Sequence, residues 1–99
     1  MPINEKGTVY MTRADWEKQL ERAKERLIET TIEWSECAKR IEYVGHRIDR
    51  NSHKSGDLVD SLCDHLTIHR KRRDVLQQRM RNTANKIESL HRRIAMHED

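Results

Sequence analysis

Apolar side chains recur along this chain in alternating steps of four and three residues, the spacing of a coiled-coil seam. A first set of seam positions spans residues 16–48: Trp16, Leu20, Ala23, Leu27, Thr30, Trp34, Cys37, Ile41, Val44 and Ile48. A second set spans residues 59–94: Val59, Leu62, Leu66, His69, Arg73, Leu76, Met80, Thr83, Ile87, Leu90 and Ile94. Such a regular spacing predicts two long helices, each of which buries a single stripe against a partner.

The two seams are separated by the polar, turn-rich stretch 51–56, which reads Asn-Ser-His-Lys-Ser-Gly. We therefore predict an all-α fold, a long antiparallel two-helix coiled-coil hairpin with arms over about 12–51 and 57–97. The turn is expected at 52–56, and residues 1–11 are expected to form an N-terminal lead-in. At 1.5 Å per residue each arm would be roughly 60 Å long.

Two local signals refine the first arm. Thr12 suits the N-cap position, and Asp15 three residues later favours the first turn with its unpaired amides. Gly45 lies inside the arm, where a glycine costs on the order of 1 kcal/mol. The same seams could also pair between two chains as an extended dimer, but Gly56 and the polar turn favour pairing within one chain.

An antiparallel register centred near Ser55 brings small residues opposite large ones in several layers, as interdigitated packing requires. Two layers pair poorly, Cys37 with Arg73 and Ile41 with His69, and they predict a wet or loosened midsection. The other predicted pairs are Trp16 with Ile94, Leu20 with Leu90, Ala23 with Ile87, Leu27 with Thr83, Trp34 with Leu76 and Ile48 with Leu62.

Composition narrows the function classes. With 99 residues, 34% hydrophobic and 37% charged, the chain cannot build the thick core that a catalytic pocket needs, so we expect no enzyme. It has no apolar run long enough for a membrane span and no apolar stretch of a signal peptide after Met1, so a cytoplasmic protein is expected. The two cysteines lie outside any CxxC motif and are expected to be reduced and partly buried.

Charge is unevenly distributed although the net charge is only +3. The run 70–81 contains six basic residues against Asp74 alone, and two interpretations stay open: a solvated helix face, or a face directed at a polyanion. The six are Arg70, Lys71, Arg72, Arg73, Arg79 and Arg81.

The start of the second arm carries the candidate chemistry. Asp57 and Asp60 lie three residues apart, so they project on neighbouring sides of one helical turn. Two such carboxylates can share a hard divalent cation or bind one held by a partner, since Mg²⁺ commonly takes only one or two carboxylates from a protein. The alternative is that both aspartates merely cap the second helix.

Two further sets of side chains surround this region. Arg47, Arg50, His53 and Lys54 form a basic collar, which is either ordinary surface charge or an approach to RNA phosphate and metal. His65 and His69, one helical turn apart with Cys63 and Asp64 nearby, could hold zinc, but such pairs are more often surface or seam residues.

Several motifs occur in the order found in one known family. Val9-Tyr10-Met11-Thr12 precedes Glu17-Lys18, the run Gly56-Asp57-Leu58-Val59-Asp60-Ser61 falls on the predicted turn, and His65 and the run 80–90 follow. In this order they resemble the N-terminal coiled-coil domain of the Gre family of bacterial transcript-cleavage factors, over residues 9–94.

The resemblance implies a partner and a mechanism. Gre-type hairpins insert into the secondary channel of RNA polymerase, between its catalytic large subunits, and direct two tip acids at the active-site magnesium. Asp57 and Asp60 match those acids, and Gly56, Leu58 and Ser61 support the tip. Contacts with the polymerase or with the RNA 3′ end would come from Arg47, Arg50, His53, Lys54 and Arg70. No cofactor of its own is expected, because the polymerase supplies the magnesium.

The chain also departs from the family pattern. Asp60 stands where the family usually has glutamate, Ser61 where it has asparagine, and Asp15 where a glycine is usual. The arms are expected to be about three turns longer, and the family's globular C-terminal domain has no counterpart in these residues. We therefore expect either a fragment or a hairpin-only relative, which would stimulate transcript cleavage or inhibit the polymerase. The alternative function is a structural coiled-coil adaptor or dimerisation module, with a basic arm that binds a partner protein or nucleic acid.

Overall fold

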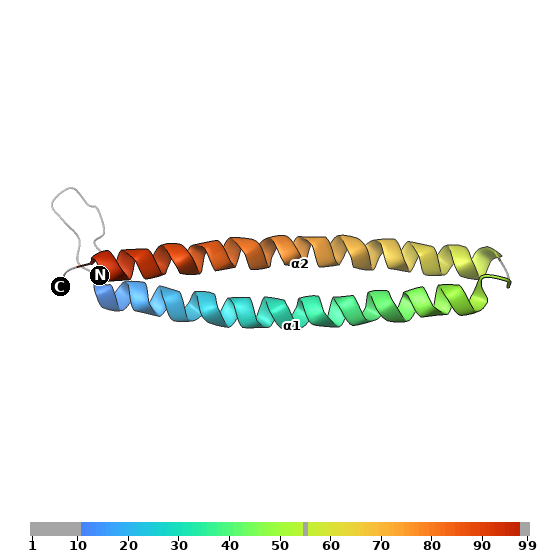
Figure 1. Cartoon of the computed structure of the whole chain (residues 1–99), viewed down its shortest axis with the longest axis horizontal. Helices are drawn as coiled ribbons and strands as arrows, with labels where there is room; N and C mark the ends of the chain where they lie inside the picture. The colour runs from blue at the N-terminus through green and yellow to red at the C-terminus, as the bar shows by residue number, and fades with distance from the viewer. Residues whose placement is uncertain (1–10, 55, 98–99) are drawn as a thin grey trace. The chain divides into compact units, whose positions relative to one another are not determined.

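The chain folds into two α-helices joined by a short turn. The computed structural model describes residues 11–54 and 56–97, in which α1 spans Arg13–Asn51 and α2 spans Gly56–Met96 (Figure 1). The predicted all-α, antiparallel two-helix hairpin is confirmed. Helix α1 ends at the residue expected from the sequence, whereas α2 begins at Gly56, one residue earlier than expected. Residues 1–10 of the predicted lead-in lie outside the described residues.

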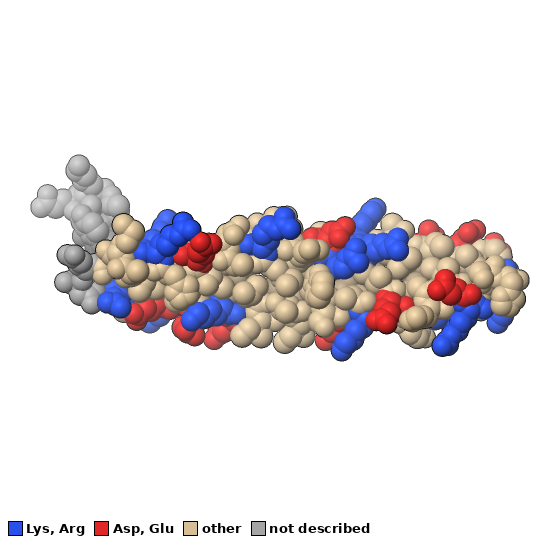
Figure 2. Space-filling model, in the orientation of Figure 1, with Lys and Arg blue, Asp and Glu red and all other residues tan. Residues whose placement is uncertain are grey.

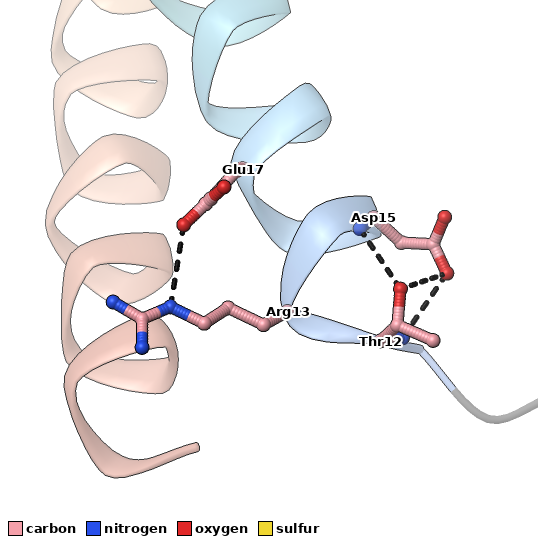
Figure 3. A network of polar contacts seen from close by, with 4 residues as sticks. All are labelled: Thr12, Arg13, Asp15 and Glu17. Atoms are coloured by element: carbon pink, nitrogen blue, oxygen red, sulfur yellow. Dashed lines mark hydrogen bonds and ion pairs between the residues drawn. The ribbon is translucent and has the colours of Figure 1, made fainter. Parts of the chain in front are cut away.

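Helix α1 begins with the predicted cap at Thr12 (Figure 3). The Asp15 amide donates to Thr12 Oγ1 at 3.2 Å, and the Thr12 amide donates to Asp15 Oδ2 at 3.0 Å. The Thr12 hydroxyl also donates to Asp15 Oδ2 at 3.0 Å, and these hydrogen bonds lower the pKa of the Asp15 carboxyl below its ordinary value. In the same turn, Arg13 pairs with Glu17 at 3.2 Å. The reciprocal bonds satisfy amides that have no partner within the helix.

The chain divides into two compact units, each described by itself below. The base unit, residues 1–28 with 81–99, has a core of Leu20, Ala23 and Leu90, against which Trp16, Ile87 and Ile94 pack. These six residues are the first three pairs of the predicted register, which places them together as one cluster.

The base unit also contains two contacts that involve polar groups, near the start of α1 and the end of α2. The Arg93 guanidinium lies over the Trp16 ring, 4.9 Å from its centroid. His97 Nε2 lies 3.1 Å from the carbonyl oxygen of Met11, so the residues just outside the two helices are in contact.

The turn unit, residues 29–80, contains the end of α1, the turn and the first part of α2. Its buried side chains are Thr30, Cys37, Val44, Leu62 and Leu76, and all five occupy predicted seam positions. Leu76 is the most buried, with 1% of its surface exposed. Trp34, also on the seam, is half-buried, and its indole N–H is buried without a hydrogen-bond partner among the described residues.

The midsection that the sequence predicts to be wet or loosened contains one packed layer with a polar cavity beside it. Cys37 is 4% exposed, and its thiol donates to the carbonyl of His69 at 3.0 Å, so this layer is packed. Beside it lies a cavity of about 230 Å³ lined by Cys37, His69 and Leu76, and by the charged side chains of Glu33, Glu36, Arg40 and Arg72. Arg72 and Glu33 form an ion pair at 3.2 Å between the two helices.

Outside the seam the helices carry charge of both signs. Lys and Arg side chains alternate with Asp and Glu over the visible face (Figure 2). Some apolar side chains are exposed as well, among them Tyr43, Ile68 and Val75. Within the described part of the chain, neither helix has the length of uninterrupted apolar sequence that crossing a membrane requires.

Candidate functional site at the turn

Helix α1 is terminated by side chains that donate hydrogen bonds to carbonyls of the same helix. Asn51 Nδ2 donates to the carbonyl of Arg47 at 2.7 Å, and the hydroxyl of Ser52 donates to the carbonyl of Asp49 at 3.1 Å. The backbone amide of Lys54 then donates to the carbonyl of Asn51 at 2.9 Å. The bonds to the carbonyls of Asp49 and Asn51 satisfy groups that the end of a helix leaves without partners. The turn therefore has a defined beginning, set by the polar residues that the sequence places there.

Gly56 opens α2 in ordinary backbone geometry. Its φ is not in the left-handed region, and a Cβ atom added to it would meet no other atom within 4 Å. The supporting role predicted for this glycine therefore does not rest on a conformation or a close approach that only glycine allows.

Asp57 and Asp60 are both exposed, in the first turns of α2. Residues three apart on a helix have their Cβ atoms about 5–6 Å from each other, so the two carboxylates are neighbours on one surface. Neither carboxylate forms a hydrogen bond or ion pair with another of the described residues, whereas Asp15 at the start of α1 does. The contacts expected of capping side chains are therefore present at Asp15 and not, within the described chain, at Asp57 or Asp60.

The apolar side chains around these acids anchor this end of α2. Leu62, one turn beyond Leu58, is 4% exposed, and Val59 is half-buried. Leu58 is 36% exposed and Ser61 is exposed, so both lie at the surface with the acids. The buried residues hold the helix in place, and the predicted site residues are left on its solvent side.

The predicted basic residues fall into two groups. Arg50 lies in the last turn of α1, and His53 and Lys54 belong to the turn itself; all three are exposed. Arg47, one turn earlier, is exposed and its guanidinium lies 5.9 Å from the centre of the Tyr43 ring. Arg70 is exposed but lies about 20 Å along α2 from its first residue, at 1.5 Å per residue. Four of the five basic residues thus flank the acids, and Arg70 does not.

The alternative zinc site gains no support from the geometry. Cys63, Asp64 and His65 are exposed, while His69 is half-buried in the layer of Cys37. Across residues 11–54 and 56–97, no group of three or more His, Cys, Asp or Glu side chains is placed to hold a metal ion. Asp57 and Asp60 alone likewise fall short of a complete metal site, so a cation bound there would need further ligands from a partner.

Sequence reasoning missed the cavities along the seam. One of about 300 Å³ in the base unit is lined by Gln19, Arg22, Ala23, Arg26, Thr83 and Lys86. The signal for it was present in the sequence. Ala23 and Thr83 are the small members of neighbouring seam layers, Arg22 precedes Ala23, and Lys86 follows Thr83 by three residues.

In comparisons with known proteins, no family model, curated protein or solved structure matches the chain.

Proposed function

We propose that this chain regulates transcription by inserting its turn into the secondary channel of bacterial RNA polymerase, as Gre-type hairpins do. Asp57 and Asp60 would then be directed at the active-site magnesium, and the protein would act in the cytoplasm with the polymerase. The observation that supports this most is the pair of exposed carboxylates, one turn apart and next to the turn, without partners among the described residues.

The turn unit has dimensions suited to a narrow space. It consists of two helical segments joined by the turn, and each segment is about 35 Å long at 1.5 Å per residue. Two packed helices with axes 8–10 Å apart are about 20 Å across with their side chains. A hairpin of this size can bring a few side chains to the end of a channel that would exclude a globular domain.

The charges at the turn fit a site that contains both metal and RNA. Mg²⁺ keeps several waters and takes only one or two carboxylates from one protein, so Asp57 and Asp60 would complete a coordination sphere begun by the polymerase. In two-metal hydrolysis the second ion positions the attacking water. Arg50 in the last turn of α1, with His53 and Lys54 in the turn itself, would face RNA phosphates.

Binding of the purified chain to core RNA polymerase at low salt tests the first step. We expect a complex on gel filtration, and its absence would refute the proposal. The second step uses a stalled, backtracked transcription complex, in which RNA length distinguishes cleavage from inhibition. Shortened RNA identifies a cleavage factor, and unchanged RNA together with slowed elongation identifies an inhibitor.

A matched pair of variants separates the tip acids from general charge. The variant Asp57→Asn with Asp60→Asn should fold normally and lose the effect on transcription. The control, Asp64→Asn with Asp74→Asn, makes the same change in net charge on the same exposed helix and should keep the effect. Equal loss in both variants would show that the acids at the turn have no special role.

A coiled-coil adaptor is the second candidate, and one observation favours it. Ile68 and Val75 are 62% and 46% exposed and lie two helical turns apart, so they share one face of α2. Exposed apolar side chains on one face can mark a protein interaction site. If this function is correct, replacing both with Ser abolishes partner binding while the Asp57 and Asp60 variant retains it.

A further inference from the structure

The base unit contains a cavity whose charged lining is entirely basic. It has a volume of about 300 Å³ and is lined by Arg22, Arg26 and Lys86, together with Gln19, Ala23 and Thr83. Ala23 and Thr83 have short side chains at positions where a coiled-coil seam usually has larger ones, which leaves the space between α1 and α2 unfilled. Gln19 and Lys86 immediately precede seam residues of the two helices, so their side chains border the same hollow.

No acidic side chain among the described residues lines this cavity. Arg22 and Lys86 form no ion pair with any other residue that the structure describes. A shallower hollow on the surface of α1 is different, because Glu17, Glu21 and Glu25 line it together with Lys18 and Arg22, so Arg22 borders acids on that side. Cations gathered in one hollow repel each other, and an anion placed among them relieves that repulsion.

The donors in the cavity match a phosphate group. A guanidinium presents parallel N–H groups that bind two phosphate oxygens at once, and an ammonium adds a point charge. The Thr83 hydroxyl and the Gln19 side-chain amide supply neutral donors at the same place. About 300 Å³ lies at the lower limit of small-molecule pockets, which suits a compact anion.

We propose that this cavity binds a compact phosphate anion, such as pyrophosphate or the terminal phosphates of a nucleotide, through Arg22, Arg26 and Lys86. The inference is independent of the proposed role in transcription, since none of these residues belongs to the turn unit. Because the three residues are exposed, binding is expected to weaken as ionic strength rises.

Titration of the full ¹⁵N-labelled chain with pyrophosphate, followed by NMR at constant ionic strength, tests the proposal. We expect saturable shifts at Arg22, Thr83 and Lys86, and no such shifts with chloride. The variant Arg22→Gln with Lys86→Gln should weaken binding about tenfold or more, because it removes two charged donors. The control, Lys24→Gln with Arg92→Gln, makes the same change in net charge on the same unit and should leave the affinity within about twofold.

Circular dichroism shows whether both variants keep their helices. Equal weakening in the two variants would overturn the site, since it would mean that only net charge attracts the anion. Shifts that never saturate would overturn it as well. Binding of a single-stranded oligonucleotide without binding of pyrophosphate or a nucleoside triphosphate would refute the compact-anion assignment and indicate a nucleic-acid surface. Saturable binding that only the cavity variant loses supports the proposal.

Discussion

The thiol of Cys37 in α1 donates a hydrogen bond to the backbone carbonyl of His69 in α2, with 3.0 Å between Sγ and the oxygen. Cys37 is buried at a seam position that the predicted register pairs with Arg73 of the opposite helix. Because the side chain is short, its sulfur can reach the backbone of the other helix. A longer apolar side chain would keep the two backbones farther apart. A polar contact to the backbone therefore takes the place of an apolar pair in this layer.

Replacing Cys37 should lower the free energy of unfolding more than replacing Cys63 does. Cys37→Ala removes a buried sulfur and its weak hydrogen bond, and we expect the free energy of unfolding to fall by about 1 kcal/mol. Cys63 is exposed, so Cys63→Ala should change it by no more than about 0.5 kcal/mol. Urea denaturation followed by circular dichroism measures both. Equal effects would show that the thiol of Cys37 contributes nothing beyond what its exposed counterpart does.

Leu76 should be the most sensitive apolar position of the turn unit, because only 1% of its surface is exposed. Leu76→Ala is expected to lower the free energy of unfolding by about 2–5 kcal/mol, the usual range for a buried leucine. Its neighbour Val75 is 46% exposed, and Val75→Ala should cost far less. If Leu76→Ala fails to fold, Leu76→Met should still fold and lose less than about 1.5 kcal/mol. Similar melting temperatures for the two alanine variants would contradict the assigned seam.

The seam could be predicted because a two-helix hairpin depends on a single periodicity. Each helix has one partner, so the alternating steps of four and three fix both the buried stripe and its register. Trp16, Leu20 and Ala23 meet Leu90, Ile87 and Ile94 in one cluster, as the register requires. The end of α1 at Asn51 could also be predicted, because polar residues that bind the last carbonyls gather there.

Contacts that depend on side-chain length and rotamer could not be predicted from spacing. The bond from Cys37 to the backbone of His69 is of this kind, and so is the indole N–H of Trp34, which has no partner among the described residues. The basic cavity also depends on which long side chains turn toward Ala23. At the turn, spacing places Asp57 and Asp60 on one surface, but what they bind depends on ligands outside this chain.

Thr12 and Asp15 form a reciprocal cap whose loss should unwind the first turn of α1. Thr12→Ala removes the hydroxyl that accepts a hydrogen bond from the Asp15 amide, and a loss of about 1 kcal/mol is expected. Thr12→Ser keeps that acceptor and should retain most of the stability. Amide hydrogen exchange in residues 13–16 should accelerate in the alanine variant only. Unchanged exchange there would mean that the cap does not hold the helix end.

The same cap predicts a pH dependence. Hydrogen bonds from the backbone and hydroxyl of Thr12 hold the pKa of Asp15 below its ordinary value of 3.8. A lowered pKa in the folded chain means that this carboxylate stabilises the fold above pH 3.8 and that its contribution disappears as the pH falls through the folded pKa. The melting temperatures of the natural chain and Asp15→Asn should therefore differ near pH 7 and converge in strong acid. A difference that does not depend on pH would rule out the charged form as the cause.

Gly45 offers a change that should stabilise the protein. It lies inside α1, where glycine is unfavourable because the unfolded chain gains conformational freedom from it. A Cβ atom added at this position meets no other atom within 4 Å, so alanine fits without displacing a neighbour. Gly45→Ala should raise the free energy of unfolding by about 0.5–1 kcal/mol. The matched reversal is Ala38→Gly, seven residues earlier on the same face and also half-buried, which should lower it by about the same amount. Thermal and urea unfolding of the two single variants and of the double variant measure the effect. The double variant should have nearly the stability of the natural chain. A destabilising Gly45→Ala would show that the added methyl group meets a neighbouring atom.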